Sequence, residues 1–354
     1  MILLRACAFV LLVALASPLF ALKIPRPFVY NRATRNLAGT VVDYTHNNRH
    51  DNRIWSESLC EKRDLYVYLP PGYDKNKSYP LFIWMHGFTQ DENTFLDYVV
   101  KRFDCAISQG VIPPMIVIAP DGSIGKNWKI VPPGSFFINS KAGKFEDYLM
   151  KDVLGFVTQN YLISPHRRDH GLGGTSMGGA AAYHLGMKHQ QFFKNIAGIY
   201  PPLNIRYQDK HGRFMGNYDP MFRELRDDFS RGSMTVGRFF GIIYIKVDHV
   251  LGELFDYRSP DVIKEIAAMN PIEMIDYYKV DKADLSFFLA YGGKDQFNLD
   301  AQAESFLDRA REKNLDITVR YDPKGRHDTP TAIRFLPELL EWLGGQMSGK
   351  AEEK

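Results

Sequence analysis

Three residues of the chain have the types, and the order along the sequence, that nucleophilic catalysis requires: Ser176, Asp295 and His327. Ser176 lies in Gly174–Gly178, which reads G-x-S-x-G, the pattern of a nucleophile elbow. A serine hydroxyl is a weak nucleophile unless a base takes its proton and a third group orients that base. The sequence therefore predicts Ser176 as the nucleophile, His327 as the base and Asp295 as the orienting acid.

The residues around Ser176 suit an elbow, in which a strand runs into a tight turn and a helix starts at once. Upstream, His170–Gly174 can form a short buried strand. Downstream, the small residues of Gly179–Ala182 allow a helix to pack closely on a sheet. The backbone N–H of Met177 is expected to bind the oxyanion, together with that of Phe88 in the loop after an earlier strand.

Asp295 and His327 each follow a predicted strand, over residues 285–291 and 317–321. Both are therefore expected at the carboxyl edge of a parallel sheet, where sites collect. Asp328 and Asp300 compete for the role of the acid. Asp328 is a weak candidate because sequence neighbours rarely orient each other's side chains, and Asp300 has the position of a helix-start residue.

Other histidines compete with His327 for the role of the base. His170 lies inside the predicted elbow strand and His184 inside the following helix, so both are expected to be structural. His189 ends that helix and is expected to be exposed, and His86 is expected to shape a loop.

Strands and helices alternate with short connections along most of the chain, which predicts an α/β fold: a mostly parallel central sheet with helices on both faces. The strand over residues 63–69 alternates and is expected to have two unlike faces, whereas the strands over 81–85 and 115–119 are continuously apolar. The other expected elements are helices over 91–108, 145–161, 299–313 and 329–343 and strands over 195–200, 285–291 and 317–321.

Residues 203–284 interrupt this alternation and are predicted to be a largely helical insertion before the strand that carries the acid. The segment is rich in phenylalanine and methionine, including Phe239 and Phe240. These side chains either form a small core of the insertion itself or cover a substrate pocket, and the two alternatives are compatible. We expect the insertion to set substrate choice without taking part in the chemistry.

The composition is that of a soluble globular protein, with 45% hydrophobic and 24% charged residues among 354. The net charge of +3 and the absence of a basic block give no support for a nucleic-acid partner. Residues 1–21 have the layout of a secretory signal peptide, the alternative being an uncleaved membrane anchor. We expect a secreted or periplasmic protein without stable membrane insertion, in which residues 22–354 form a single domain.

Cys60 and Cys105 remain after removal of the signal peptide. An even pair in an oxidising compartment could form a disulfide, and two buried free thiols are the alternative. The sequence contains no CxxC pair and no cluster of metal ligands, so no cofactor or metal is expected.

Several segments resemble the putative-esterase family of α/β-hydrolases, which includes S-formylglutathione hydrolases, feruloyl and acetylxylan esterases, enterochelin esterases and mycolyltransferases. They are Val67–Tyr73, His86-Gly87, Pro113–Ile118, Phe145–Leu149 and Gly173–Gly179. The resemblance implies that the serine, acid and histidine of the family correspond to Ser176, Asp295 and His327. It covers residues 60–200 well and 285–343 loosely, and the insertion has no counterpart in it.

The sequence therefore predicts a secreted serine esterase that acts on a small-molecule or carbohydrate-linked ester through an acyl-enzyme, with acylated carbohydrates and aryl esters as candidate substrates. An acyltransferase of the same fold is one alternative. A catalytically silent α/β-hydrolase domain used for binding is the other, although a binding module has no need of a triad.

Overall fold

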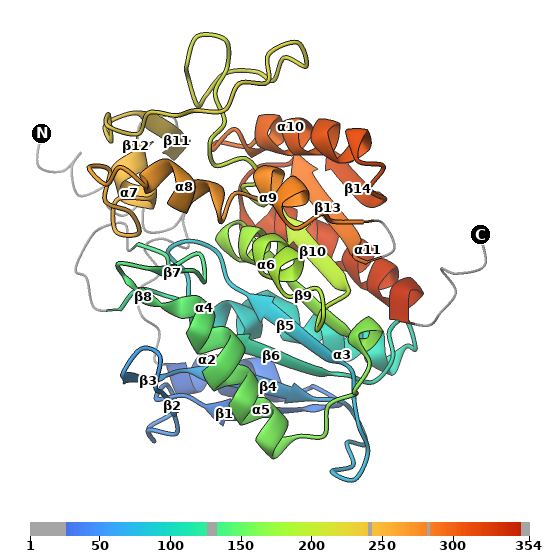
Figure 1. Ribbon diagram of the computed structural model, residues 1–354. Coiled ribbons are helices and arrows are strands. Elements are labelled where there is room, and N and C mark those ends of the chain that lie inside the picture. The colour runs from blue at the N-terminus through green and yellow to red at the C-terminus, as the bar shows by residue number, and fades with distance from the viewer. Residues whose placement is uncertain (1–25, 126–132, 240–242, 282–283, 348–354) are drawn as a thin grey trace, which may run out of the picture.

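The computed structural model describes residues 26–125, 133–239, 243–281 and 284–347 (Figure 1). The expected signal peptide over residues 1–21 lies outside this part of the chain. The strands are β1 (Thr40–Tyr44), β2 (Ile54–Ser56), β3 (Glu61–Arg63), β4 (Leu65–Leu69), β5 (Leu81–Met85), β6 (Ile116–Pro120), β7 (Asn139–Ser140), β8 (Gly143–Lys144), β9 (His170–Thr175), β10 (Asn195–Ile199), β11 (Thr235–Phe239), β12 (Ile243–Lys246), β13 (Ser286–Gly292) and β14 (Ile317–Asp322).

The helices connect these strands in the alternation that the sequence predicts. They are α2 (Arg26–Thr34), α3 (Val100–Ser108), α4 (Phe145–Asp147), α5 (Leu154–Asn160), α6 (Met177–Lys188), α7 (Val247–Val250), α8 (Val262–Ala267), α9 (Pro271–Tyr277), α10 (Leu299–Glu312) and α11 (Thr329–Met347). The π-helical segments η2 (Phe95–Val99) and η3 (Tyr148–Val153) lead into α3 and α5, and a short 3₁₀ helix, η4 (Arg167–Asp169), precedes β9.

Eight strands form one sheet in the order β1-β4-β6-β5-β9-β10-β13-β14. All pairs from β6 to β14 are parallel, and only β4 pairs antiparallel with its two neighbours. The predicted α/β fold with a mostly parallel sheet is therefore confirmed. The carboxyl ends of β5, β9, β10, β13 and β14 share one edge because these strands run in the same direction.

Buried hydrophobic side chains pack on both faces of this sheet. One cluster joins the sheet to α5, α6, α9 and α10, and the other joins it to α3 and α11. All residues of β5, β6, β9 and β10 are buried, as expected for central strands covered on both sides.

The strand over 63–69 has the two unlike faces predicted, one aliphatic and one aromatic, and both are buried. Leu65 and Val67 face one cluster and Tyr66 and Tyr68 the other, and all four are fully buried. Tyrosine can occupy the second face because its hydroxyl finds a partner there: the Tyr68 hydroxyl donates to Asp104 Oδ1 at 2.9 Å.

The insertion between β10 and β13 is mixed rather than largely helical. It contains the β11–β12 hairpin and the short helices α7, α8 and α9, and residues 201–234 contain neither helix nor strand. Aspartates in this stretch accept hydrogen bonds from nearby backbone N–H groups, as Asp209 does from His211 and Arg213 at 2.9 Å each. Such local bonds compete with helix formation, which explains the loops.

Cys60 and Cys105 form no disulfide, and both are exposed free thiols. Neither of the two expectations is therefore met, because the thiols are neither paired nor buried. Cys60 lies in the turn between β2 and β3, and Cys105 lies on α3. No helix among the described residues is long and apolar enough to span a bilayer.

Glu146 in α4 ties this helix to the end of α6. Its carboxylate binds Lys188 Nζ at 2.8 Å and His189 Nε2 at 3.0 Å. Burial alone would raise the pKa of this carboxyl, but the bonds to His189 and Lys188 lower the pKa of Glu146 to about 2. Relative to the ordinary value of 4.5, this corresponds to about 3 kcal/mol of stability at neutral pH.

Glu146→Gln is expected to lower the free energy of unfolding at pH 7 by about 3 kcal/mol. Because the folded-state pKa is depressed, the wild-type contribution is complete above pH 4.5 and is lost as the pH falls toward 2. The two proteins should therefore converge in stability in this window in urea titrations. Glu341→Gln, at an exposed position of α11, is the control. An equal difference between Glu146→Gln and wild type at pH 7 and pH 2 would contradict this account.

Candidate active site

Ser176 lies at the sharp turn between β9 and α6. Its backbone has φ 52° and ψ −120°, a conformation that is strained for a residue with a side chain. A Cβ atom built on Gly174 would lie 2.3 Å from Met85 O, and one built on Gly178 would lie 2.1 Å from the same oxygen. Only glycine fits at these two positions, so strand, turn and helix can approach closely enough to hold the strained serine.

Ser176, His327 and Asp295 lie together at the carboxyl edge of the sheet. Ser176 Oγ is 2.9 Å from His327 Nε2, and His327 Nδ1 is 2.9 Å from Asp295 Oδ2. The Asp295 side chain is 1% exposed and that of His327 14%. Because a carboxylate can only accept, His327 donates from Nδ1 to Asp295, which leaves Nε2 free to accept the serine proton.

The loops that carry the acid and the histidine are held to each other by further bonds. Asp295 Oδ1 accepts the Phe297 N–H at 2.8 Å, and Gln296 Oε1 accepts the His327 N–H at 2.8 Å. The His327 ring contacts two aromatic rings, with centroids 4.4 Å from that of Tyr200 and 4.8 Å from that of Phe297. The imidazole is thus held through its backbone, by two aromatic contacts and through Nδ1.

The competing acids have other positions. Asp328 Oδ1 accepts the Thr331 N–H at 2.9 Å at the start of α11, so this carboxylate caps a helix. Asp300 lies in the first turn of α10, and burial raises the pKa of its carboxyl. His327 binds Asp295 and neither of these two.

The competing histidines bind structural partners. His170 Nε2 is 2.8 Å from Ser164 O, and its ring stacks on Phe192. His184 Nε2 is 2.8 Å from Phe136 O, and burial lowers the pKa of His184 to about 4. His189 is paired with Glu146 and is only half-buried.

The loop after β5 passes beside Ser176. A Cβ atom on Gly87 would lie 3.6 Å from Ser176 Cβ. His86 is buried behind this loop, where its Nε2 accepts the Gly122 N–H at 2.9 Å and its Nδ1 therefore donates to Gly87 O, also at 2.9 Å. The Gly87 carbonyl belongs to the same peptide unit as the Phe88 N–H, so His86 fixes the direction of that N–H.

Two further side chains at this site were not singled out from the sequence. Gln90 Oε1 accepts the Gly87 N–H at 2.8 Å and so closes the loop of Phe88. Gln296 binds the backbone of His327, as described above. Glutamines have no spacing signature, and only the adjacency of Gln296 to Asp295 could have drawn attention to it.

Met177 begins α6, where backbone N–H groups have no partner within the helix and the helix dipole favours negative charge. Its side chain meets that of Phe88 around Gly134, where a Cβ atom would lie 2.4 Å from Met177 Sδ and 2.8 Å from the Phe88 ring. The two expected oxyanion donors therefore belong to neighbouring segments beside Ser176.

A cavity of about 490 Å³ opens onto Ser176 and His327. Its wall is mainly apolar, and residues of the insertion supply part of it. These residues are Ile205, Phe214, Val236, Val247, Val250 and Leu251. The aromatic residues Phe88, Phe136, Tyr200 and Phe297 also line the cavity. The cavity can therefore accept a bulky apolar or aromatic group next to the serine.

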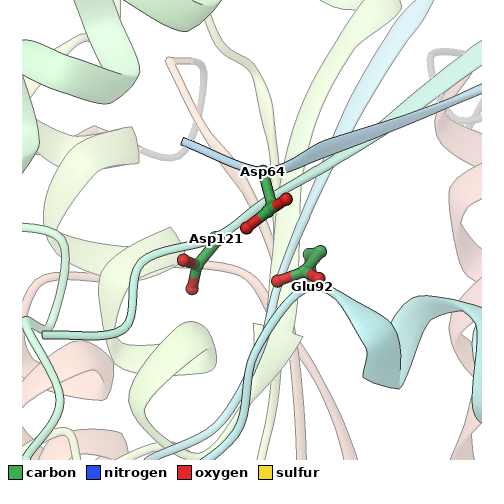
Figure 2. Close-up of side chains that lie close together, drawn as sticks. All are labelled: Asp64, Glu92 and Asp121. Atoms are coloured by element: carbon green, nitrogen blue, oxygen red, sulfur yellow. The ribbon is translucent and has the colours of Figure 1, made fainter. Parts of the chain in front are cut away.

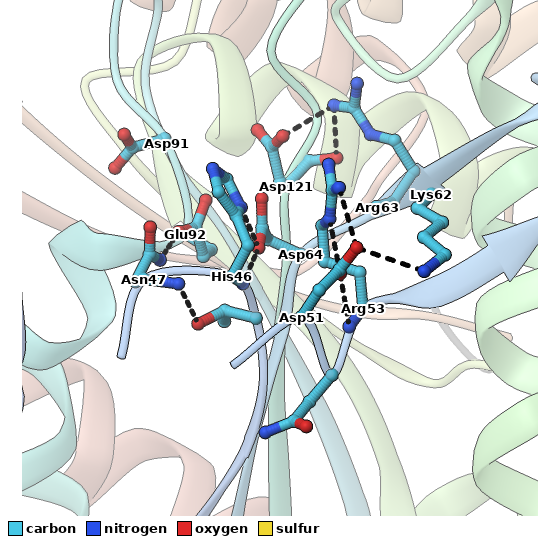
Figure 3. A network of polar contacts seen from close by, with 12 residues as sticks. His46, Asn47, Asp51, Arg53, Lys62, Arg63, Asp64, Asp91, Glu92 and Asp121 are labelled. Atoms are coloured by element: carbon cyan, nitrogen blue, oxygen red, sulfur yellow. Dashed lines mark hydrogen bonds and ion pairs between the residues drawn. The ribbon is translucent and has the colours of Figure 1, made fainter. Parts of the chain in front are cut away.

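Behind the loop of His86, three buried carboxylates lie close together, those of Asp64, Glu92 and Asp121 (Figure 2). Their ligand atoms lie within 4.8 Å of one another, which would suit a cation. Each carboxylate, however, already has protein donors (Figure 3). They are His46 for Asp64 at 2.8 Å, Asn47 for Glu92 at 2.7 Å and Arg63 for Asp121 at 2.8 Å.

Arg63 is the charged group that offsets part of the negative charge of this cluster. Burial alone would raise the pKa of the Asp121 carboxyl, but the Arg63 guanidinium holds that pKa well below its usual range. Arg63 is itself buried, and it also donates to the carbonyls of Asp121 and Ser123. These contacts connect the segments next to β4 and β6 with the loop after β5.

Comparison with known proteins gives a consistent picture. The family described as "Putative esterase" matches residues 56–331. Endo-1,4-beta-xylanase Y of Acetivibrio thermocellus is 31% identical over 247 residues, which are 65% of this chain and 20% of that protein. The chain thus spans a fifth of the length of this relative.

Solved structures show the same fold at low identity. A ferulic acid esterase superposes with a TM-score of 0.64 at 18% identity, over 88% of this chain and 100% of the other. An S-formylglutathione hydrolase from Agrobacterium tumefaciens superposes with a TM-score of 0.58 at 14% identity, over 88% of this chain and 96% of the other. This similarity establishes the α/β-hydrolase fold.

Proposed function

The chain belongs to the putative esterase family and as a member of it is a carboxylic ester hydrolase, and from this premise we propose that it is a serine esterase that works through an acyl-enzyme on Ser176. The observation that carries the proposal is the pair of 2.9 Å contacts from Ser176 Oγ to His327 and from His327 to the buried Asp295. A strained serine with a base and an oriented acid is the arrangement that nucleophilic catalysis needs.

In the first half of the reaction, Ser176 Oγ attacks the ester carbonyl while His327 Nε2 takes the hydroxyl proton. The carbonyl oxygen becomes an oxyanion, which accepts hydrogen bonds from the Phe88 and Met177 N–H groups. One such donor contributes about 3–4 kcal/mol to the transition state. His327 then gives its proton to the leaving alcohol, and the acyl group stays on Ser176.

In the second half, water loses a proton to His327 and attacks the acyl-enzyme. The carboxylic acid leaves, and Ser176 Oγ recovers its proton. Throughout, Asp295 keeps the Nδ1–H of His327 directed away from the serine and stabilises the imidazolium. These residues complete the reaction with groups of the chain and one water molecule.

Aryl or other bulky esters, including those linked to carbohydrates, are the proposed substrate class. The mainly apolar cavity beside Ser176 supports an aromatic acyl group. A ferulic acid esterase and a xylanase among the similar proteins support esters of ferulic acid, including those carried by xylan, in particular. Secretion, proposed from the pattern of residues 1–21, suits a polymeric substrate outside the cell.

A panel of esters tests this proposal. The purified protein is assayed with methyl ferulate, p-nitrophenyl acetate and S-formylglutathione, each with and without an added alcohol acceptor. We expect the highest kcat/KM for methyl ferulate, whose acyl group is aromatic, and release of the free acid. Formation of a new ester with the added alcohol as the main product would identify an acyltransferase instead, and no turnover of any substrate would leave only the binding function.

Phe214 allows a direct test of whether the insertion sets substrate choice. It lines the cavity, and its backbone carbonyl is held by Asn298 Nδ2. Of the two phenylalanines noted in the sequence, Phe239 ends β11 and Phe240 lies outside the described residues. Phe214→Leu is expected to lower kcat/KM for methyl ferulate relative to p-nitrophenyl acetate by about 3–10-fold, the value of one aromatic contact.

The control for Phe214→Leu is Phe222→Leu, at a half-buried phenylalanine of the insertion that lines a separate cavity. This control should leave the ratio of the two substrates unchanged. Labelling of Ser176 by a small fluorophosphonate should be the same in all three proteins. Equal losses on both esters and in labelling would show that the insertion does not set substrate choice.

A further inference from the structure

The insertion does more than line the cavity: it is bonded directly to the loop that carries the acid. The backbone N–H of Arg238 in β11 donates to Gln296 O at 3.0 Å. On the other side of the loop, Asn298 Nδ2 donates to Phe214 O at 2.9 Å and to Gly216 O at 2.8 Å. The residues that follow Asp295 are thus tied to two separate segments of the insertion.

The hairpin also packs closely on the aromatic ring between these two bonds. A Cβ atom built on Gly237 would lie 2.2 Å from the Phe297 ring, so only glycine allows β11 to come this near. The Phe297 ring also contacts the base, because its centroid lies 4.8 Å from that of the His327 ring. Displacement of the hairpin would therefore be transmitted to the imidazole.

Gln296 bonds to both the insertion hairpin and His327. Its backbone carbonyl accepts the bond from Arg238, and its side-chain oxygen accepts the His327 N–H at 2.8 Å. We propose that Gln296 is a positioning residue through which docking of the insertion hairpin sets the placement of His327. The proposal rests on the proposed function, since it assigns a task to the base of that reaction. It gives the insertion a part in positioning that base, in addition to the expected part in substrate choice.

Gln296→Met tests the first link, because methionine keeps the length of the side chain and removes the acceptor for His327. We expect kcat for p-nitrophenyl acetate to fall about tenfold or more, since small misplacements of a catalytic group have effects up to about 100-fold. KM for this small ester and the melting temperature should stay at the wild-type values. Gln296→Glu keeps an acceptor oxygen and should restore most of kcat, and Gln109→Met, at an exposed glutamine, is the control.

Gly237→Ala tests the second link from within the insertion. The added methyl group must displace either the hairpin or Phe297, so kcat for the acetyl ester should also fall about tenfold, with KM unchanged. Gly155→Ala is the matched control, because a Cβ atom there meets nothing within 4 Å. The small acetyl ester is used so that changes in the fit of a bulky acyl group do not enter the result.

The outcomes separate this inference from the proposed function. Wild-type kcat in Gln296→Met, or equal losses in Gln296→Met and Gln296→Glu, would overturn the role of the Gln296 acceptor. A Gly237→Ala protein that is altered only toward methyl ferulate would overturn the coupling to the hairpin. Wild-type activity that survives Ser176→Ala would instead overturn the proposed function.

Discussion

Ser176→Ala is expected to lower kcat for p-nitrophenyl acetate by at least about 10⁴-fold, because the acyl-enzyme can no longer form. The residual rate would come from the oxyanion donors and from substrate binding alone. The fold should be unaffected, because alanine keeps the Cβ atom and adds no bulk at the turn. Ser108→Ala, at an exposed serine of α3, is the control and should retain wild-type kcat.

Circular dichroism and the melting temperature of the Ser176→Ala protein show whether a loss of activity comes from the missing nucleophile or from unfolding. A well-folded variant with less than about 10⁻⁴ of wild-type kcat agrees with a covalent mechanism. Turnover within tenfold of wild type would mean that another group attacks the ester, and the assignment of the site would have to be abandoned.

Asp295→Asn is expected to lower kcat by about 10⁴-fold while the geometry of the site is preserved. An amide in place of the buried carboxylate can donate to His327 Nδ1, which favours the tautomer that cannot accept the serine proton. The asparagine also does not stabilise the imidazolium. Stopped-flow or steady-state assays of the acetyl ester measure the loss, with the melting temperature as the check on folding.

Asp328→Asn is the matched control for Asp295→Asn, since it makes the same change one residue away from His327. Asp328 caps α11 through the Thr331 N–H, and asparagine caps helices as well as aspartate does. Its kcat should therefore stay within a few-fold of wild type. A larger loss in Asp328→Asn than in Asp295→Asn would show that Asp328 is the acid.

The sequence was most informative where the chain has little freedom. Around Ser176 the glycines are required by backbone contacts, so their pattern predicts the turn. Asp295 and His327 could be placed because parallel strands bring their carboxyl ends to one edge, whatever the distance between them along the chain. These features depend on local backbone geometry and on the direction of strands, and the sequence pattern predicts both.

The sequence was least informative where long-range contacts decide. The burial of Tyr66 and Tyr68 could not be predicted, because it depends on hydroxyl partners from distant segments. The loops at 201–234 depend on aspartate-to-backbone bonds rather than on a periodic pattern. The link from Arg238 through Gln296 to His327 joins three segments that have no relation in the sequence.

The most direct test of the account is the site and rate of labelling by diisopropyl fluorophosphate, followed by intact mass and peptide mapping. We expect a single adduct on Ser176 in the wild-type protein, none in Ser176→Ala, and much slower labelling in Asp295→Asn than in Asp328→Asn. An adduct on any other residue, or labelling of Ser176→Ala at the wild-type rate, would contradict the claim that Ser176 is the nucleophile.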